Sequence, residues 1–247
     1  MDNFKIGLTS TTFRQKSHSE IVGIAKDAGA QYIEWGTDIH VKTPDDAANV
    51  KSLCDAAGIG ICSCGSYYTA GCGDKDEWLR ICALAHEMSA PSIRIWLGNK
   101  NSEKTSAAEY ERLLEDTRSM CSAAERSGLT VCAECHGNTF NNNTDAILRF
   151  CDELKCENFR TYFQSRYHSL DYDLDRIERT FEITRDVHIS YSELTREQRF
   201  KKKNREYIDI LLKKLLEKDF AGVVMIEFTR QASAEYFMQD VKRLKSY

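Results

Sequence analysis

One junction recurs along this 247-residue chain and limits the folds that it can adopt. In four segments a helical pattern ends near a glycine and continues into a short apolar strand: AKDAGAQYIEW, CDAAGIGICSC, AERSGLTVCAE and, more loosely, KDFAGVVMIEF. Gly29, Gly58 and Gly128 suit the left-handed backbone conformation that closes a helix. Such junctions are typical of a chain in which helices and strands alternate.

Signals for helix starts fit the same alternation. Ser17 with Glu20 and Ser106 with Glu109 have the spacing of a capping box, and Pro44 suits a first helical position. Eight strands are expected, near residues 4–9, 31–35, 59–65, 92–97, 129–134, 159–164, 186–190 and 222–228. Eight strand–helix units in about 250 residues, without a Pro- or Gly-rich linker, favour one α/β domain over residues 1–247. The predicted fold is a (β/α)8 TIM barrel rather than two doubly wound domains.

The composition argues against several kinds of partner. A formal net charge of −4 gives no basic excess for nucleic acid, and no apolar run reaches the ~18 residues of a membrane span. The N-terminus lacks the basic and apolar regions of a signal peptide, so we expect a cytoplasmic protein. Most of the ten cysteines fall in helical or strand patterns and are expected to be free thiols. A zinc site at Cys132 and Cys135 is rejected, because strand alternation sends the two side chains to opposite faces. The oligomeric state stays open, and a homo-oligomer is compatible with the sequence.

Polar side chains end four of the expected strands in the second half of the chain. They are Glu134 after LTVCA, Gln164 after FRTYF, His188 after DV and Glu227 after GVVMI. An acid or imidazole at the end of an apolar strand is costly to bury alone, and a shared cation offsets that cost. In a barrel the C-terminal ends of all strands meet at one mouth. The pattern therefore predicts a metal site.

The strand ends also resemble those of a known family. The segments QYIEWGTDIHV, CGSYY, SIRIWLG, CAECHGNT, TYFQ, VHIS and MIEF, in this order, are similar to the xylose isomerase-like barrels, and specifically to their sugar phosphate isomerase/epimerase group. The resemblance implies a divalent metal, Mn²⁺ or Mg²⁺ ahead of Zn²⁺ or Co²⁺, held by Glu134, Gln164, His188 and Glu227. Better-characterised epimerases of this group carry Asp where this chain has Gln164. Losing that negative charge weakens a site for a hard cation and leaves its occupancy open.

The resemblance further implies a reaction on a small-molecule sugar, polyol or sugar phosphate. Glu134 and Glu227 would pass a proton across the substrate through an enediolate, with the metal polarising the adjacent oxygens. His168 corresponds to a sugar-binding histidine of related enzymes, although it lies one residue farther from Gln164 than the familiar spacing. Independently of the family, residues at strand ends or in the loops above the barrel are candidates for substrate binding: His40, Tyr68, Trp96, His136 and Arg230, with Tyr67 beside them.

Each assignment has an alternative. Glu134 and Glu227 could be buried acids paired with interior cations, and Glu34 with Arg94 is expected to form such an interior ion pair. The basic stretch 200–205 is interpreted as a solvated helix face rather than a phosphate site. For function, the alternatives to the isomerase are an inosose dehydratase-like lyase and a sugar-binding barrel without catalysis. An abasic-site endonuclease is disfavoured, since it needs more metal ligands and a basic face for DNA.

Overall fold

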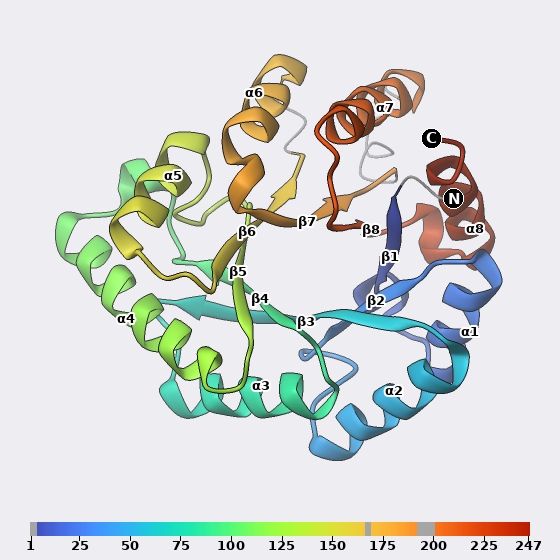
Figure 1. Ribbon diagram of the computed structural model, residues 1–247, viewed down its shortest axis with the longest axis horizontal. Coiled ribbons are helices and arrows are strands. Elements are labelled where there is room, and N and C mark those ends of the chain that lie inside the picture. Colours follow the sequence, from blue (N-terminus) through green and yellow to red (C-terminus); the bar gives the residue numbers. More distant parts are fainter. Residues whose placement is uncertain (1–3, 166–168, 192–200) are drawn as a thin grey trace.

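The computed structural model describes residues 4–165, 169–191 and 201–247, and its strands form a closed parallel barrel (Figure 1). The strands follow chain order around the barrel, and β1 pairs with β8 to close it. They are β1 (Lys5–Thr9), β2 (Tyr32–Gly36), β3 (Gly60–Ala70), β4 (Ser92–Leu97), β5 (Thr130–Glu134), β6 (Phe159–Gln164), β7 (Thr184–Ile189) and β8 (Val223–Ile226). The prediction of a single (β/α)8 TIM barrel is confirmed.

Eight α-helices lie among the described residues and surround the barrel (Figure 1). They are α1 (His18–Ala28), α2 (Pro44–Ala57), α3 (Lys75–Glu87), α4 (Ala107–Glu125), α5 (Thr144–Leu154), α6 (Leu170–Thr180), α7 (Lys201–Glu217) and α8 (Ala234–Leu244). The predicted capping boxes begin α1 and α4, and Pro44 opens α2 behind Thr43. Among the described helices, none combines the length and apolarity that a bilayer crossing requires.

The predicted glycine junctions are confirmed where the helix ends directly at the glycine. Gly29 and Gly58 close α1 and α2 with φ of 73° and 72°. Gly128 is also left-handed, with φ of 69°, but it lies beyond the cap residue Arg126 of α4. In the fourth, looser copy the left-handed residue before β8 is Asp219, with φ of 54°.

Alternation divides the barrel into two cores. A small cluster fills the inside and contains Cys62, Cys132, Tyr162, Val223 and Met225. The larger core lies between strands and helices and includes Ala133, Phe163 and Ile226, as alternation predicts. Continued alternation along β8 would place Phe228 on the helix side as well, but the chain leaves the strand before this residue. Because β8 ends at Ile226, Phe228 lies in a loop with φ of 58° and 36% exposure. All ten cysteines are free, as expected for most of them.

Candidate functional site

The four predicted ligand residues come from consecutive strands and meet at the C-terminal mouth of the barrel. Glu134 ends β5, Gln164 ends β6, His188 lies near the end of β7, and Glu227 directly follows β8. Ligand atoms of Glu134, His188 and Glu227 all lie within 4.8 Å of one another, and the three side chains are buried. Gln164 joins them, because its Nε2 donates to Glu227 Oε2 at 2.7 Å.

Two side chains of β4 hold one oxygen of Glu134. Arg94 Nη1 and Trp96 Nε1 both donate to Oε2, at 2.6 and 2.8 Å. Arg94 Nε also donates to Glu34 Oε1 at 3.2 Å, so the predicted Glu34–Arg94 ion pair is confirmed. The second bond of Arg94 pairs Glu134 with an interior cation, which the sequence analysis gave as an alternative without naming Arg94. Its signal was available, because Arg94 pairs in register with Cys132, two residues before Glu134 on the same face.

His188 lies among three carboxylates. Its Nδ1 is 3.2 Å from Glu134 Oε1 and 3.7 Å from Glu227 Oε2, and its Nε2 is 3.5 Å from Glu34 Oε1. Tyr162 packs its ring edge-on against the imidazole, with ring centroids 5.2 Å apart. The ring is therefore fixed by packing as well as by charge.

The site holds more negative than positive charge. One guanidinium, that of Arg94, faces the carboxylates of Glu34, Glu134 and Glu227. Burial opposes the charged form of His188, yet Glu34 and Glu227 raise the pKa of this histidine to about 10. Burial also raises the pKa of Glu227 to about 7; His188 opposes this shift and Glu134 reinforces it. Burial would likewise raise the pKa of Glu134, but Arg94 and His188 hold it below its usual range.

This donor set fits a divalent cation. Two carboxylates and an imidazole are close enough to share one ion, and the buried Oε1 of Gln164 has no hydrogen-bond partner among the described residues. The excess of buried negative charge would be offset by a positive ion. Glu134, His188 and Glu227 thus form a possible metal site, to which Gln164 can add an amide oxygen.

An aromatic rim borders the same mouth. The Trp96 ring stacks on His136, with centroids 4.8 Å apart and planes 16° apart, and Tyr67 meets Trp96 edge-on at 5.1 Å. Arg94 also lies under Tyr67, 5.4 Å from its ring centroid. His136 Nδ1 lies 2.8 Å from the carbonyl oxygen of Gly137, which leaves its Nε2 for another partner. Trp96 and His136 are therefore placed beside Glu134, together with Tyr67.

Three other predicted substrate-binding residues make their recorded contacts outside this cluster. Tyr68 is buried on the helix side of β3 and packs against Trp78 at 5.2 Å. His40 is buried against Trp35 and His18, and its Nδ1 lies 3.1 Å from Ser10 Oγ.

Arg230 follows β8 in a short 3-10 helix, and its guanidinium carbon lies 3.4 Å from the Tyr236 ring centroid. His168 lies outside the described residues.

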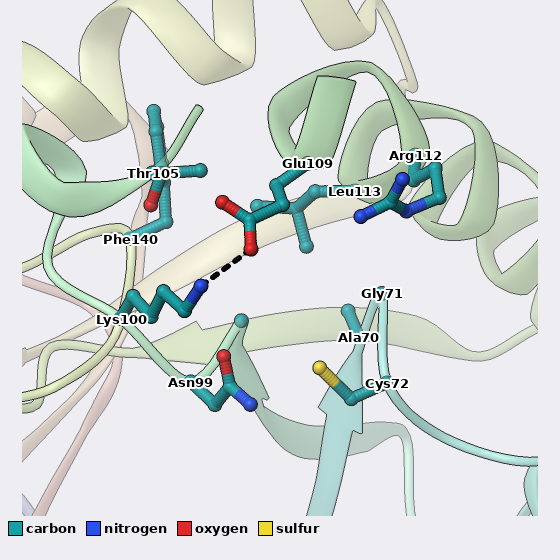
Figure 2. Close-up of a pocket in the computed structure, with 11 residues that line it drawn as sticks. Ala70, Gly71, Cys72, Asn99, Lys100, Thr105, Glu109, Arg112, Leu113 and Phe140 are labelled. Atoms are coloured by element: carbon teal, nitrogen blue, oxygen red, sulfur yellow. Dashed lines mark hydrogen bonds and ion pairs between the residues drawn. The ribbon is translucent and has the colours of Figure 1, made fainter. Parts of the chain in front are cut away.

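A separate pocket of about 160 Å³ lies beside the ends of β3 and β4, against α4 (Figure 2). Lys100 pairs there with Glu109 at 2.5 Å, and Arg112 and Cys72 extend toward the same space. None of the predicted site residues lines this pocket. This pocket is therefore distinct from the cluster at the barrel mouth.

Comparisons with known proteins agree with this geometry. The model of the family described as "Xylose isomerase-like TIM barrel" matches residues 22–247. No curated protein sequence matches the chain.

Several solved structures share the fold. The probable 3-DHS dehydratase AsbF from Bacillus anthracis is 16% identical, with 97% of this chain and 98% of that chain covered and a TM-score of 0.80. The 3-keto-D-glucoside 4-epimerase YcjR from E. coli is 15% identical, with 99% of this chain and 100% of that chain covered and a TM-score of 0.75. D-Psicose 3-epimerase from Clostridium cellulolyticum H10 is 14% identical, with 98% of this chain and 94% of that chain covered and a TM-score of 0.71. At these identities the similarity establishes the fold alone.

Proposed function

This chain belongs to the xylose isomerase-like TIM barrel family, and from that premise we propose that it is a metal-dependent sugar or sugar phosphate isomerase or epimerase. The observation that carries the proposal is the meeting of Glu134, His188 and Glu227 from three strands, with Gln164 bonded to Glu227. Structures of similar fold include epimerases that act on a 3-keto-D-glucoside and on D-psicose. A small-molecule sugar is accordingly the proposed substrate.

The proposed cation is Mn²⁺ or Mg²⁺, with Zn²⁺ or Co²⁺ as alternatives, held by Glu134, Gln164, His188 and Glu227. Oxygen donors predominate in this set, which suits hard cations. When bound, the cation would polarise neighbouring carbonyl and hydroxyl oxygens of a ketose and so acidify the adjacent C–H bond. Gln164 supplies no negative charge, so we expect weaker binding than a third carboxylate would give.

Glu134 and Glu227 are the proposed proton carriers. Glu134 is kept ionised by Arg94, while Glu227, with its pKa near neutrality, can take up or release a proton at neutral pH. One carboxylate removes the C–H proton to give an enediolate, and the other returns a proton to the opposite face of the carbon. The carbon is then inverted, which is an epimerisation.

The aromatic rim would orient the sugar. Trp96 offers an apolar face to ring carbons, and Tyr67 extends that surface. His136 is fixed by its stacking on Trp96, and its Nε2, for which the described residues supply no hydrogen bond, can bond a sugar hydroxyl. These contacts would hold the reacting carbon between the two glutamates.

A dehydratase, such as an inosose dehydratase-like lyase, is the second candidate. Its first step is the same proton abstraction, and the probable 3-DHS dehydratase of similar fold motivates it. Loss of a hydroxide requires in addition an acid near the leaving group. The two candidates differ in product rather than in the initial chemistry.

The test combines metal analysis with proton exchange. Purified protein should bind Mn²⁺ or Mg²⁺ stoichiometrically, and a screen of ketoses and inosose in D₂O should give deuterium in the recovered sugar only with the cation present. Glu227→Gln should abolish the exchange, whereas Glu235→Gln, an exposed position on α8, should leave it unchanged. An unsaturated product would identify the dehydratase. A metal-free protein that binds sugars without exchange would contradict the enzyme proposal and favour a non-catalytic sugar-binding barrel.

A further inference from the structure

Glu34 is a buried carboxylate that the proposed chemistry does not use. It lies on β2, is 2% exposed, and accepts a bond from Arg94 Nε through Oε1 alone. Its Oε2 is buried and has no hydrogen-bond partner among the described residues. A carboxylate with one oxygen unsatisfied is costly to bury, so its position calls for a role beyond the ion pair.

The neighbouring strand leaves space for this side chain. A Cβ atom added at Gly65 on β3 would lie 2.9 Å from Glu34 Oε1 and 3.2 Å from its Cδ and Cγ. The backbone of Gly65 is not left-handed, so the close contact with Glu34 is what favours a glycine there. Glu34 thus projects from β2 into space that Gly65 leaves open on β3.

Glu34 faces one nitrogen of His188, and the candidate ligands face the other. Glu34 Oε1 lies 3.5 Å from Nε2, which has no hydrogen-bond partner among the described residues, while Nδ1 is within 3.2 Å of Glu134 and 3.7 Å of Glu227. A cation held by Nδ1 would take the lone pair of that nitrogen and leave the ring proton on Nε2, which faces Glu34. Arg94 bonds both Glu34 and Glu134 and so fixes the two carboxylates relative to each other.

We propose that Glu34 is a positioning residue for His188: when Nδ1 holds the divalent cation, Glu34 is the acceptor for the Nε2–H of the imidazole and keeps the ring in place. The cation part of this inference rests on the proposed function. The contact between Glu34 and His188 is present without a cation and can be tested separately.

The first experiment follows His188 by NMR in protein labelled with ¹⁵N at histidine, with the signal assigned by its loss in His188→Asn. In metal-free wild type, the Nε2–H proton should be protected from exchange, and in Glu34→Ala its chemical shift and protection should change. On addition of diamagnetic Mg²⁺ or Zn²⁺, the Nδ1 resonance should shift while Nε2 keeps its proton. A Nε2–H signal that is unchanged in Glu34→Ala, or a cation that shifts Nε2 while Nδ1 stays protonated, overturns the proposal.

The second experiment measures Mn²⁺ affinity by calorimetry. Glu34→Ala should weaken binding about 10–100-fold, the usual effect of losing the partner of a ligating histidine. Glu34→Gln should weaken binding less, because its amide oxygen still accepts from Nε2–H. Gly65→Ala should also weaken binding, although it removes no polar group, since it displaces Glu34.

Ser63→Ala is the matched control. Ser63, on β3, pairs in register with Glu34, and its Oγ has no partner among the described residues. The Mn²⁺ affinity of Ser63→Ala should therefore equal that of wild type. Wild-type affinity in Glu34→Ala would overturn the positioning role. If wild type binds no divalent cation, the proposed function fails, and the metal-free NMR comparison still decides whether Glu34 holds Nε2–H.

Discussion

At the scale of single residues, Arg94 balances the buried charge of the barrel mouth. It is 3% exposed and bonds two carboxylates from two other strands. The carboxylates are also needed for any cation site, so the arginine must neutralise part of their charge without filling the space between them. Trp96 contributes a second donor from the same strand and carries no charge.

Replacing Arg94 by Leu should lower the free energy of unfolding by about 3–5 kcal/mol at pH 7, because Glu34 and Glu134 lose their buried partner. The pKa of Glu134 is lowered in the folded protein, so its stabilising contribution is present above its ordinary value of 4.5 and is lost as the pH falls. Urea unfolding should therefore show a difference from wild type that shrinks below that pH. A variant within 1 kcal/mol of wild type at pH 7 would contradict this account.

Replacing Trp96 by Phe keeps an aromatic ring between Tyr67 and His136 and removes the donor to Glu134. A hydrogen bond to a charged group contributes about 1.5–3 kcal/mol to stability. Because Trp96 is partly exposed, urea unfolding should show that the free energy of unfolding falls by an amount near the lower end of this range. Tyr67→Phe is the control, because among the described residues the Tyr67 hydroxyl accepts a hydrogen bond from the exposed Arg14 alone. This variant should change the free energy of unfolding by less than about 0.5 kcal/mol. Equal losses in both variants would argue against the role given to Trp96.

At the scale of elements, a register shift in β3 decides which tyrosine faces the site. The pairing of β2 with β3 moves from Ile33–Ile61 to Glu34–Ser63, so one residue of β3 is skipped. Strict alternation from Cys62, which is inside the barrel, would also send Tyr68 inside. Because of the shift, the odd-numbered residues that follow on β3 face the inside in place of the even-numbered ones. Tyr67 therefore contacts Trp96 and Arg94 at the site, and Tyr68 does not face it. A skipped residue leaves no clear mark in one sequence, so this part of the site could not be predicted.

Two glycines outside the site should respond to Ala in opposite directions. Gly222, before β8, has room for no side chain, because its Cβ would lie 2.0 Å from the carbonyl oxygen of Arg185. Gly222→Ala should lower the unfolding free energy by more than about 2 kcal/mol, by straining the approach of β7 to β8. A Cβ added at Gly23, within α1, would meet no atom within 4 Å. Gly23→Ala should therefore raise the free energy of unfolding by about 0.5–1 kcal/mol. Urea unfolding of both variants checks the pair, and stabilisation by Gly222→Ala would refute the packing argument.

At the scale of the whole molecule, the closed barrel was predictable because several strand–helix units repeat the same signals. Gly29 and Gly58 mark helix ends, and the capping boxes mark starts, so local chemistry and global topology agree. The meeting of Glu134, His188 and Glu227 followed from strand ends alone. The surroundings of Tyr68, His40 and Arg230 did not follow from the sequence, because loop paths and side-chain directions depend on packing that a single sequence does not display, and their roles in substrate binding stay predictions.

A cation that binds only the folded barrel should stabilise it as a unit. At about 100 times the dissociation constant the gain is about 2.7 kcal/mol, which thermal melts with increasing Mn²⁺ should reveal as a rising midpoint. Excess EDTA should reverse the shift, and Glu227→Gln should reduce it. Gly23→Ala should have a different melting midpoint from wild type without Mn²⁺, but Mn²⁺ should raise both midpoints by the same amount. A midpoint that is indifferent to Mn²⁺, Mg²⁺, Zn²⁺ and Co²⁺ would speak against the metal site.

The two halves of the barrel contribute differently to the mouth, and this bears on how such a protein can diversify by recombination. Every candidate ligand comes from β5–β8, whereas Arg94 and Glu34 come from β4 and β2. A chimera joined between β4 and β5 would inherit its ligands from one parent and their electrostatic balance from the other. Such exchanges should succeed only between parents whose first halves present an arginine and an acid at these two places.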